Sequence, residues 1–106
     1  MDPDLAVFRD KVGPILDAAD QGLDIAADSE AGEAAQTVDL LVQDAGRLAD
    51  SVPPSSIADR WFSAVDAYAG DLQALRTAYE RGESGARQSD AARDALEGLN
   101  EIIGAG

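Results

Sequence analysis

The chain of 106 residues contains no cysteine, no histidine and a single lysine, and only 5% of its residues are aromatic. Without cysteine it can form neither a disulfide nor a thiolate metal site. Without histidine it lacks the usual general base and the commonest transition-metal ligand. No apolar run approaches the length that spans a bilayer, and the chain does not open with a charged and then apolar signal segment. We therefore expect a cytoplasmic protein or, if a signal segment was removed, an exported protein of the cell envelope.

Acidic residues dominate the charge. The 21 Asp and Glu residues outnumber the 8 Lys and Arg residues, which gives a formal net charge of −13. Residues 1–50 carry 12 acids and 3 bases, whereas residues 51–106 carry 9 acids and 5 bases, so the first half is the more negative. This charge disfavours direct binding to nucleic acid or to an anionic membrane. Three interpretations stay open: a well-hydrated surface of background composition, a surface shaped for a basic partner, and mimicry of nucleic acid.

The apolar content predicts one helical domain. A hydrophobic fraction of 45% is ordinary for a globular protein, and a chain of this length can bury one core, so residues 1–106 are expected to form a single domain. Much of the apolar content is alanine, and the runs of Val, Ile and Thr that favour strands are missing. Small side chains suit close packing between helices. The composition therefore predicts an all-α fold.

The strongest apolar stripe lies between Ser56 and Tyr79, a stretch that holds most of the aromatic residues. Steps of three and four residues place its largest side chains on one side of a helix. These side chains are Ile57, Trp61, Val65, Tyr68, Leu72, Leu75 and Tyr79. Ser56 and Asp59 resemble a capping box at the start of this helix, and Gly82 suits a cap at its end. We expect this helix to be central to the fold.

The same spacing repeats in three more blocks, which predicts helices at about residues 3–27, 30–51, 56–81 and 85–103. Pro14 interrupts the first block, but the stripe stays in phase across it, so one kinked helix is preferred to two short ones. Links of about three to five residues favour antiparallel neighbours. The sequence therefore predicts an antiparallel up-down four-helix bundle.

The residues that catalysis and metal binding usually need are missing or isolated. The di-metal sites of helical bundles need Glu-x-x-His pairs, which a chain without histidine cannot form. The serines lack a histidine or lysine base, and no Gly-rich phosphate loop follows a strand. We therefore expect no enzymatic activity, no cofactor and no resident metal.

Two features are candidates for binding a partner. The first is an acidic row that recurs every three or four residues on one side of the first helix: Asp17, Asp20, Asp24 and Asp28. A solvated outer face is the simpler interpretation of this row, and loose binding of Ca²⁺ or Mg²⁺ by opposing carboxylates is another. The second is the pair Trp61-Phe62, since Trp and other aromatic side chains are common at interfaces. We expect Trp61 to lie in the core, whereas Phe62 either joins the core or faces outward, towards a partner.

These observations favour a non-catalytic protein-interaction or accessory module, whose partner is a protein and, in one version of the hypothesis, a basic one. The alternative is an acidic inhibitor that imitates nucleic acid and binds a nuclease or a DNA- or RNA-binding protein. The alanine-rich seams can pack within one chain or between two, so a monomer and a homodimer are both open.

Residues 48–103 resemble the small helical proteins that actinobacteria export, often as lipoproteins. The resemblance rests on the segment Leu48-Ala49-Asp50-Ser51-Val52-Pro53-Pro54, on the aromatic helix after it, and on Gly82-Glu83 before an alanine-rich closing helix. It implies a location in the cell envelope and no known chemistry, although the lipid-bearing cysteine is absent. Tyr79-Glu80-Arg81-Gly82-Glu83 is also similar to the Tyr-x-x-x-Asp/Glu export pattern of secreted helical hairpins, but Trp61-Phe62-Ser63 lacks the glycine of their central Trp-x-Gly turn.

Overall fold

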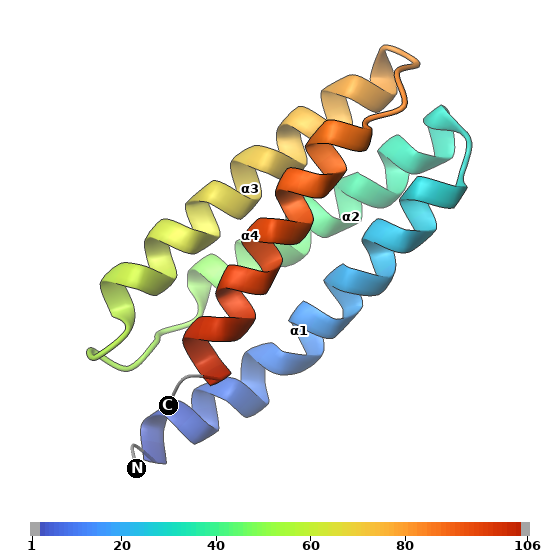
Figure 1. Ribbon diagram of the computed structural model, residues 1–106. Coiled ribbons are helices and arrows are strands. Elements are labelled where there is room, and N and C mark those ends of the chain that lie inside the picture. The colour runs from blue at the N-terminus through green and yellow to red at the C-terminus, as the bar shows by residue number, and fades with distance from the viewer. Residues whose placement is uncertain (1–2, 105–106) are drawn as a thin grey trace.

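Four α-helices make up the protein in the computed structural model, which describes residues 3–104, with side chains from residue 5 onwards (Figure 1). The helices are α1 (Pro3–Asp28), α2 (Ala31–Asp50), α3 (Ala58–Glu80) and α4 (Ala86–Gly104). Each bound lies within two residues of the one expected from the apolar periodicity. The described part of the chain contains no strand, so the prediction of an all-α fold is confirmed.

The helices form an antiparallel up-down bundle with short connections (Figure 1). Consecutive helices pack against each other, and α1 also packs against α4, which closes the bundle. The diagonal pairs, α1 with α3 and α2 with α4, do not approach within 8 Å between Cα atoms in the described residues. The bundle measures 46 × 20 × 20 Å. This square arrangement gives each pair of neighbouring helices its own outer face.

Trp61 fills the core at the end of the bundle where α1 begins. Its side chain is fully buried, and its indole Nε1 donates a hydrogen bond to the carbonyl oxygen of Leu48, 3.3 Å away in the last turn of α2. The ring of Phe8 meets it edge to face, with centroids 4.8 Å apart and an interplanar angle of 82°. The prediction that Trp61 is a core residue is confirmed, and this aromatic pair links the diagonal helices α1 and α3 through their side chains.

Glycine shapes the bundle at two places. Gly22 is buried on the side of α1 that faces α2, and a Cβ atom there would lie 2.6 Å from Cδ2 of Leu41. At the end of α3, the N–H of Glu83 donates to the carbonyl of Ala78 and the N–H of Gly82 donates to that of Tyr79. These two bonds, with Gly82 at φ +76°, form a Schellman cap. The predicted cap at Gly82 is therefore confirmed.

The start of α3 differs from the prediction. The residue before its first turn is Ile57, not Ser56, and Ile57 makes no side-chain capping bond. A turn closed by the hydrogen bond from the N–H of Ile57 to the carbonyl of Pro54 comes first. The helix therefore begins two residues later than expected, because this turn, which starts at Pro54, comes before it, and the capping bonds expected of Ser56 and Asp59 stay a prediction.

At the other end of the chain, α1 runs unbroken through Pro14, whose side chain is exposed, so the alternative of two short helices is wrong. The bend expected at this proline stays a prediction.

Nε of Arg9 donates a hydrogen bond of 2.9 Å to the carbonyl of Ile103 in the last turn of α4. A cation there complements the partial negative charge of the helix end and ties α1 to α4.

Candidate interaction surfaces

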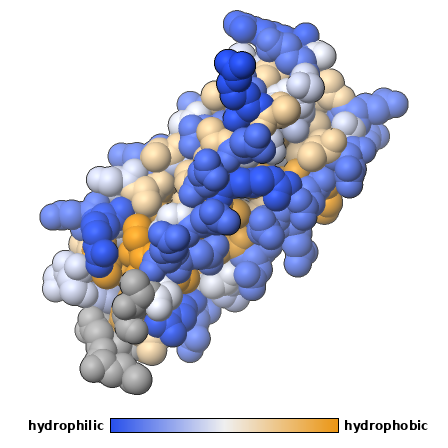
Figure 2. Space-filling view, in the orientation of Figure 1, coloured by the Kyte–Doolittle hydropathy of each residue, from blue (hydrophilic) through white to orange (hydrophobic). Residues whose placement is uncertain are grey.

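The acidic row of α1 lies on the outer side of the helix, next to α4. All four carboxylates, Asp17, Asp20, Asp24 and Asp28, are exposed. Their spacing keeps them on one side of α1, while the buried residues of the same helix point inward. Figure 2 shows the face formed by α1 and α4 as mostly hydrophilic, with hydrophobic side chains only in small patches.

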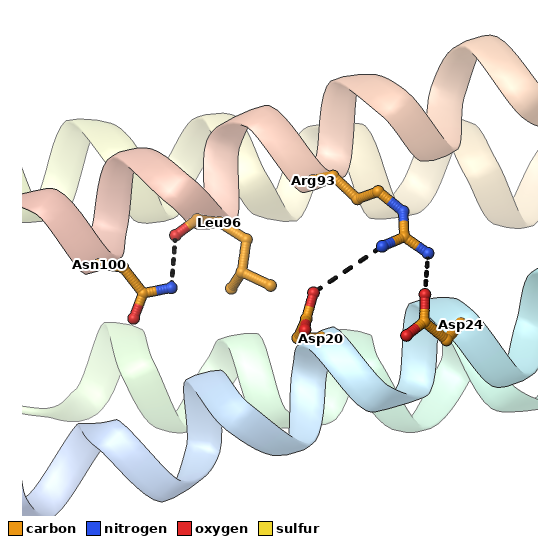
Figure 3. A network of polar contacts seen from close by, with 5 residues as sticks. All are labelled: Asp20, Asp24, Arg93, Leu96 and Asn100. Carbon is orange, nitrogen blue, oxygen red and sulfur yellow. Dashed lines mark hydrogen bonds and ion pairs between the residues drawn. The ribbon is translucent and has the colours of Figure 1, made fainter.

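Arg93 of α4 reaches across to the middle of this row (Figure 3). Its Nη2 donates a hydrogen bond to Oδ1 of Asp24, and its Nη1 lies 3.8 Å from Oδ1 of Asp20. The hydrogen bond to Asp24 is the largest cause that raises the pKa of the guanidinium, and the negative charges of Asp24, Asp20 and Asp90 act in the same direction, against desolvation. Arg93 therefore partly neutralises the centre of the row and leaves Asp17 and Asp28 at its two ends.

A groove of about 290 Å³ runs beside this ion pair, between α1 and α4. It is lined by Leu16, Asp17, Asp20, Arg93, Leu96, Glu97 and Asn100. The leucines belong to the buried core, so they form an apolar floor, and the carboxylates form the rim. Nδ2 of Asn100 donates to the carbonyl of Leu96, 3.1 Å away, which leaves its side-chain oxygen as an acceptor (Figure 3). Such a groove suits a long side chain with a positive end.

A second groove, which we call the end groove, lies where α1 begins. It has a volume of about 500 Å³ and is lined by Val7, Phe8, Lys11, Val52, Pro53, Pro54 and Ser55. Val7 and Val52 are 70% and 84% exposed, so this groove brings two exposed apolar side chains together. The rigid pair of Phe8 and Trp61 supports the floor of this groove.

Phe62 stands apart from the acidic row. It lies on α3, the helix diagonally opposite α1, and 43% of its surface is exposed. Its outward position follows from its place next to the buried Trp61. Because α1 and α3 share no outer face, the candidate residues of the sequence belong to two different surfaces.

Potential metal ligands are not clustered in residues 5–104. No cluster of three or more potential metal-ligating side chains occurs there. The carboxylates of this part of the chain are exposed or half-buried, and Ser51 and Ser89 are its buried polar side chains apart from the tyrosines. Ser51 Oγ donates to the carbonyl of Arg47, so it is used to cap α2. None of the four helices is both long enough and apolar enough to cross a membrane.

No protein-family model matches the sequence, and comparison with curated proteins and with solved structures returned no similar protein. The interpretation of these surfaces therefore rests on their own geometry and charge.

Sequence reasoning missed Arg93 and the end groove. Arg93 follows Ala92, which belongs to the buried stripe of α4. A residue at the edge of such a stripe points towards a neighbouring helix, and this was the sequence feature that could have identified Arg93. The end groove had no such signal, because it joins residues of α1 to the connection between α2 and α3, about 45 positions away.

Proposed function

We propose that the protein is a non-catalytic interaction module that binds a basic protein segment along the face between α1 and α4. One observation carries the proposal: exposed carboxylates line a groove with an apolar floor and continue beyond it along the same face. Those in the groove are Asp17, Asp20 and Glu97, and those beyond it are Asp24, Asp28 and Asp90. Charge complementarity of this kind favours fast and selective encounter with a basic partner.

The arrangement of Arg93 supports binding that is reversible and selective. Its two ion pairs are exposed, so each contributes little to stability and can exchange partners. An arginine or lysine of the partner would compete with Arg93 for Asp20 and Asp24, and its methylene groups would cover Leu16 and Leu96. Asp17 and Asp28, which Arg93 does not contact, would add attraction at both ends.

A titration with an arginine-rich peptide tests the proposal. Amide resonances of the isotope-labelled protein are followed by NMR at low and high salt. We expect the largest shifts at residues 17–28 and 90–97. Replacing Asp17→Asn together with Asp28→Asn should weaken binding roughly fivefold, on the basis of about 0.5 kcal/mol for each exposed ion pair. Added salt should weaken it further.

The matched control is Asp59→Asn together with Asp66→Asn. These two carboxylates are also exposed but lie on α3, diagonally across from α1. This double variant removes the same charge and should leave the affinity almost unchanged. An equal loss in both double variants, or shifts spread evenly over all four helices, would show that the peptide senses only net charge and would contradict the proposed site.

A second candidate function is mimicry of nucleic acid, and the exposed row on α1 favours it. Neighbouring carboxylates at this helical spacing lie roughly 5–6 Å apart, and they present a line of negative charge along one side of the bundle. Mimicry would make the protein a competitive inhibitor of a basic nuclease. DNA would displace the protein from the nuclease, and added salt would abolish the inhibition. A protein that leaves cleavage by several basic nucleases unchanged at low salt would not be such an inhibitor.

The cellular location is a further part of the proposal. The resemblance to small exported actinobacterial proteins supports an interaction at the cell envelope. Fractionation of the native cells with an antibody to the protein would test this, since a protein confined to the cytosolic fraction would contradict it.

A further inference from the structure

A second stripe follows the outward side of α1, separate from the acidic row. Alternating steps of four and three residues connect its members, and every one of them is exposed: Val7, Lys11, Pro14, Ala18, Gln21 and Ile25. This is the spacing of a coiled-coil seam. Val7 and Ile25, at its ends, are 70% and 57% exposed. The seam therefore faces solvent and not the core of its own bundle.

The surroundings of α1 place this seam towards α2. Val7 and Lys11 line the end groove together with the connection after α2, and Gly22, one position beyond the seam, approaches Leu41 of α2. The acidic row occupies the other flank of α1, where Arg93 of α4 contacts it. The two surfaces of α1 thus consist of different residues, and they adjoin along Asp17 and Asp24.

The seam contains no carboxylate, in a chain with a net charge of −13. A second copy of the protein is repelled by most of the surface, since both molecules carry the same charge. The seam offers it an approach through one lysine, neutral side chains and two large apolar residues. The charge pattern therefore fits a second copy on this side of α1.

The seam is also complementary to a second copy of itself that runs in the opposite direction. Two antiparallel copies of α1 can be related by a two-fold axis beside position 16. Each seam residue of one copy then faces the residue of the other copy that lies equally far from position 16 on the opposite side. The facing pairs are then Val7 with Ile25, Lys11 with Gln21, and Pro14 with Ala18. Apolar residues meet apolar residues, the ammonium group meets an amide oxygen, and the proline meets a small side chain. A parallel pair would instead place the two Lys11 side chains opposite each other.

We propose that this seam is the interface of a weak antiparallel homodimer, in which α1 of one copy packs against α1 of the other. The seam spans 18 residue steps and is about 27 Å long, which gives an interface at the small end of specific complexes. The dimer is therefore expected only at high protein concentration. The seam shares no residue with the proposed binding face, but Asp17 and Asp24 of that face flank it.

The flank of the seam predicts an unusual dependence on salt. Asp10, Asp17 and Asp24 each precede a seam residue by one position, and they recur every seven residues. In an antiparallel pair the same flanks of the two helices adjoin, so these carboxylates face those of the second copy. Their repulsion is screened by salt. The dimer should therefore tighten as salt is added, whereas binding of a basic segment should weaken.

Sedimentation equilibrium of the full chain at low and high salt tests the dimer. We expect the dissociation constant to fall as salt is added, and the single variants Ile25→Asp and Val7→Lys each to raise it about tenfold or more. Both positions are exposed, so the variants should stay folded. Phe62→Asp is the control, because it places the same charge at an exposed apolar residue on the opposite helix.

The double variant Val7→Lys/Ile25→Asp tests the register. In the antiparallel pair the lysine at position 7 of each copy faces the aspartate at position 25 of the other, so affinity should recover relative to either single variant. A protein that stays monomeric at about 1 mM in both salts, a dimer that weakens with salt, or a double variant no better than the singles would overturn the proposal. These variants keep every carboxylate of the acidic row, so the monomer should still bind the arginine-rich peptide at residues 17–28 and 90–97, and the two proposals fail separately.

Discussion

Gly22 determines how closely α1 and α2 approach. Its Cα hydrogen leaves room for the side chain of Leu41, which is buried in the core. Glycine normally destabilises the middle of a helix by about 0.5–1 kcal/mol relative to alanine. Glycine suits this position despite its low helix propensity, because the methyl group of an alanine would lie 2.6 Å from Cδ2 of Leu41.

We expect Gly22→Ala to be less stable than Gly70→Ala by about 1–3 kcal/mol, the usual cost of overpacking. Gly70 is the matched control, since it also lies inside a helix but has nothing within 4 Å of an added Cβ. Urea unfolding followed by circular dichroism gives both values. Equal stabilisation of the two variants would show that Leu41 moves aside without loss.

Tyr68 is the other residue with a distinct energetic signature. Its side chain is 1% exposed, and its hydroxyl has no hydrogen-bond partner among the described residues. Burial first, and the negative charge of Asp44 second, raise the pKa of this phenol above its usual value near 10. The folded protein thus keeps the Tyr68 proton at a pH where the unfolded chain releases it.

The free energy of unfolding should therefore fall as the pH rises above about 10, by up to about 1.4 kcal/mol per pH unit from this group. Below that pH the group is protonated in both states and contributes no slope. Tyr68→Phe should reduce the decline, and it should cost little stability at neutral pH because the lost hydroxyl makes no hydrogen bond. Urea titrations at about pH 8 and pH 11 measure this. Tyr79, whose pKa burial also raises, supplies a smaller remaining slope.

At the scale of elements, the connection between α3 and α4 depends on two glycines with positive φ. Gly82 has a φ of +76° and open space where a Cβ would lie. Gly85 has a φ of +65°, and a Cβ there would lie 2.8 Å from Cδ1 of Leu75 and 3.0 Å from the ring of Tyr79. The turn thus brings the backbone of Gly85 directly onto the core.

We expect Gly82→Ala to lose about 1–2 kcal/mol, the cost of the left-handed conformation alone. Gly85→Ala should lose about 1–3 kcal/mol more, because overpacking adds to the same conformational cost. Thermal unfolding of the two variants compares them directly. Equal losses would mean that Leu75 and Tyr79 rearrange freely around the added methyl group.

The elements were largely predictable because they depend on local periodicity. The buried residues of α3, from Trp61 to Tyr79, repeat with the helical spacing seen in the sequence, and the cap at Gly82 needs only local backbone geometry. The first residue of α3 was not predictable from a capping pattern, because the turn that starts at Pro54 places the helix start two residues later. Side-chain partners such as Arg93 with Asp24 join distant positions, and the periodicity of single helices does not specify them.

For the whole molecule, the net charge of −13 opposes compaction. The ion pairs recorded on its surface are exposed, such as Arg76 with Asp39, 3.0 Å apart, and exposed pairs contribute little. The apolar core therefore has to stabilise the bundle against the repulsion between its own carboxylates.

We expect the melting temperature to rise as salt increases from about 0.01 M to about 0.15 M, where the screening length shortens from about 30 Å to about 8 Å. Repulsion acts over the whole molecule, so its screening should exceed the loss from weakened surface ion pairs. Calorimetry at a protein concentration below that of any dimer measures the effect. A melting temperature that falls with salt would instead assign a large share of the stability to the ion pairs.

The hydrogen bond between Arg9 and Ile103 marks a mechanical property of the bundle. It joins the beginning of α1 to the end of α4, so both ends of the described chain lie at the same pole (Figure 1). A pulling force applied across these ends would separate α1 from α4 one contact after another, because the contacts between the two helices would not bear the load together. The protein should therefore yield at low force. A molecule attached to a surface through this pole would present the turn of Gly82 and Gly85, together with the connection between α1 and α2, at its far end.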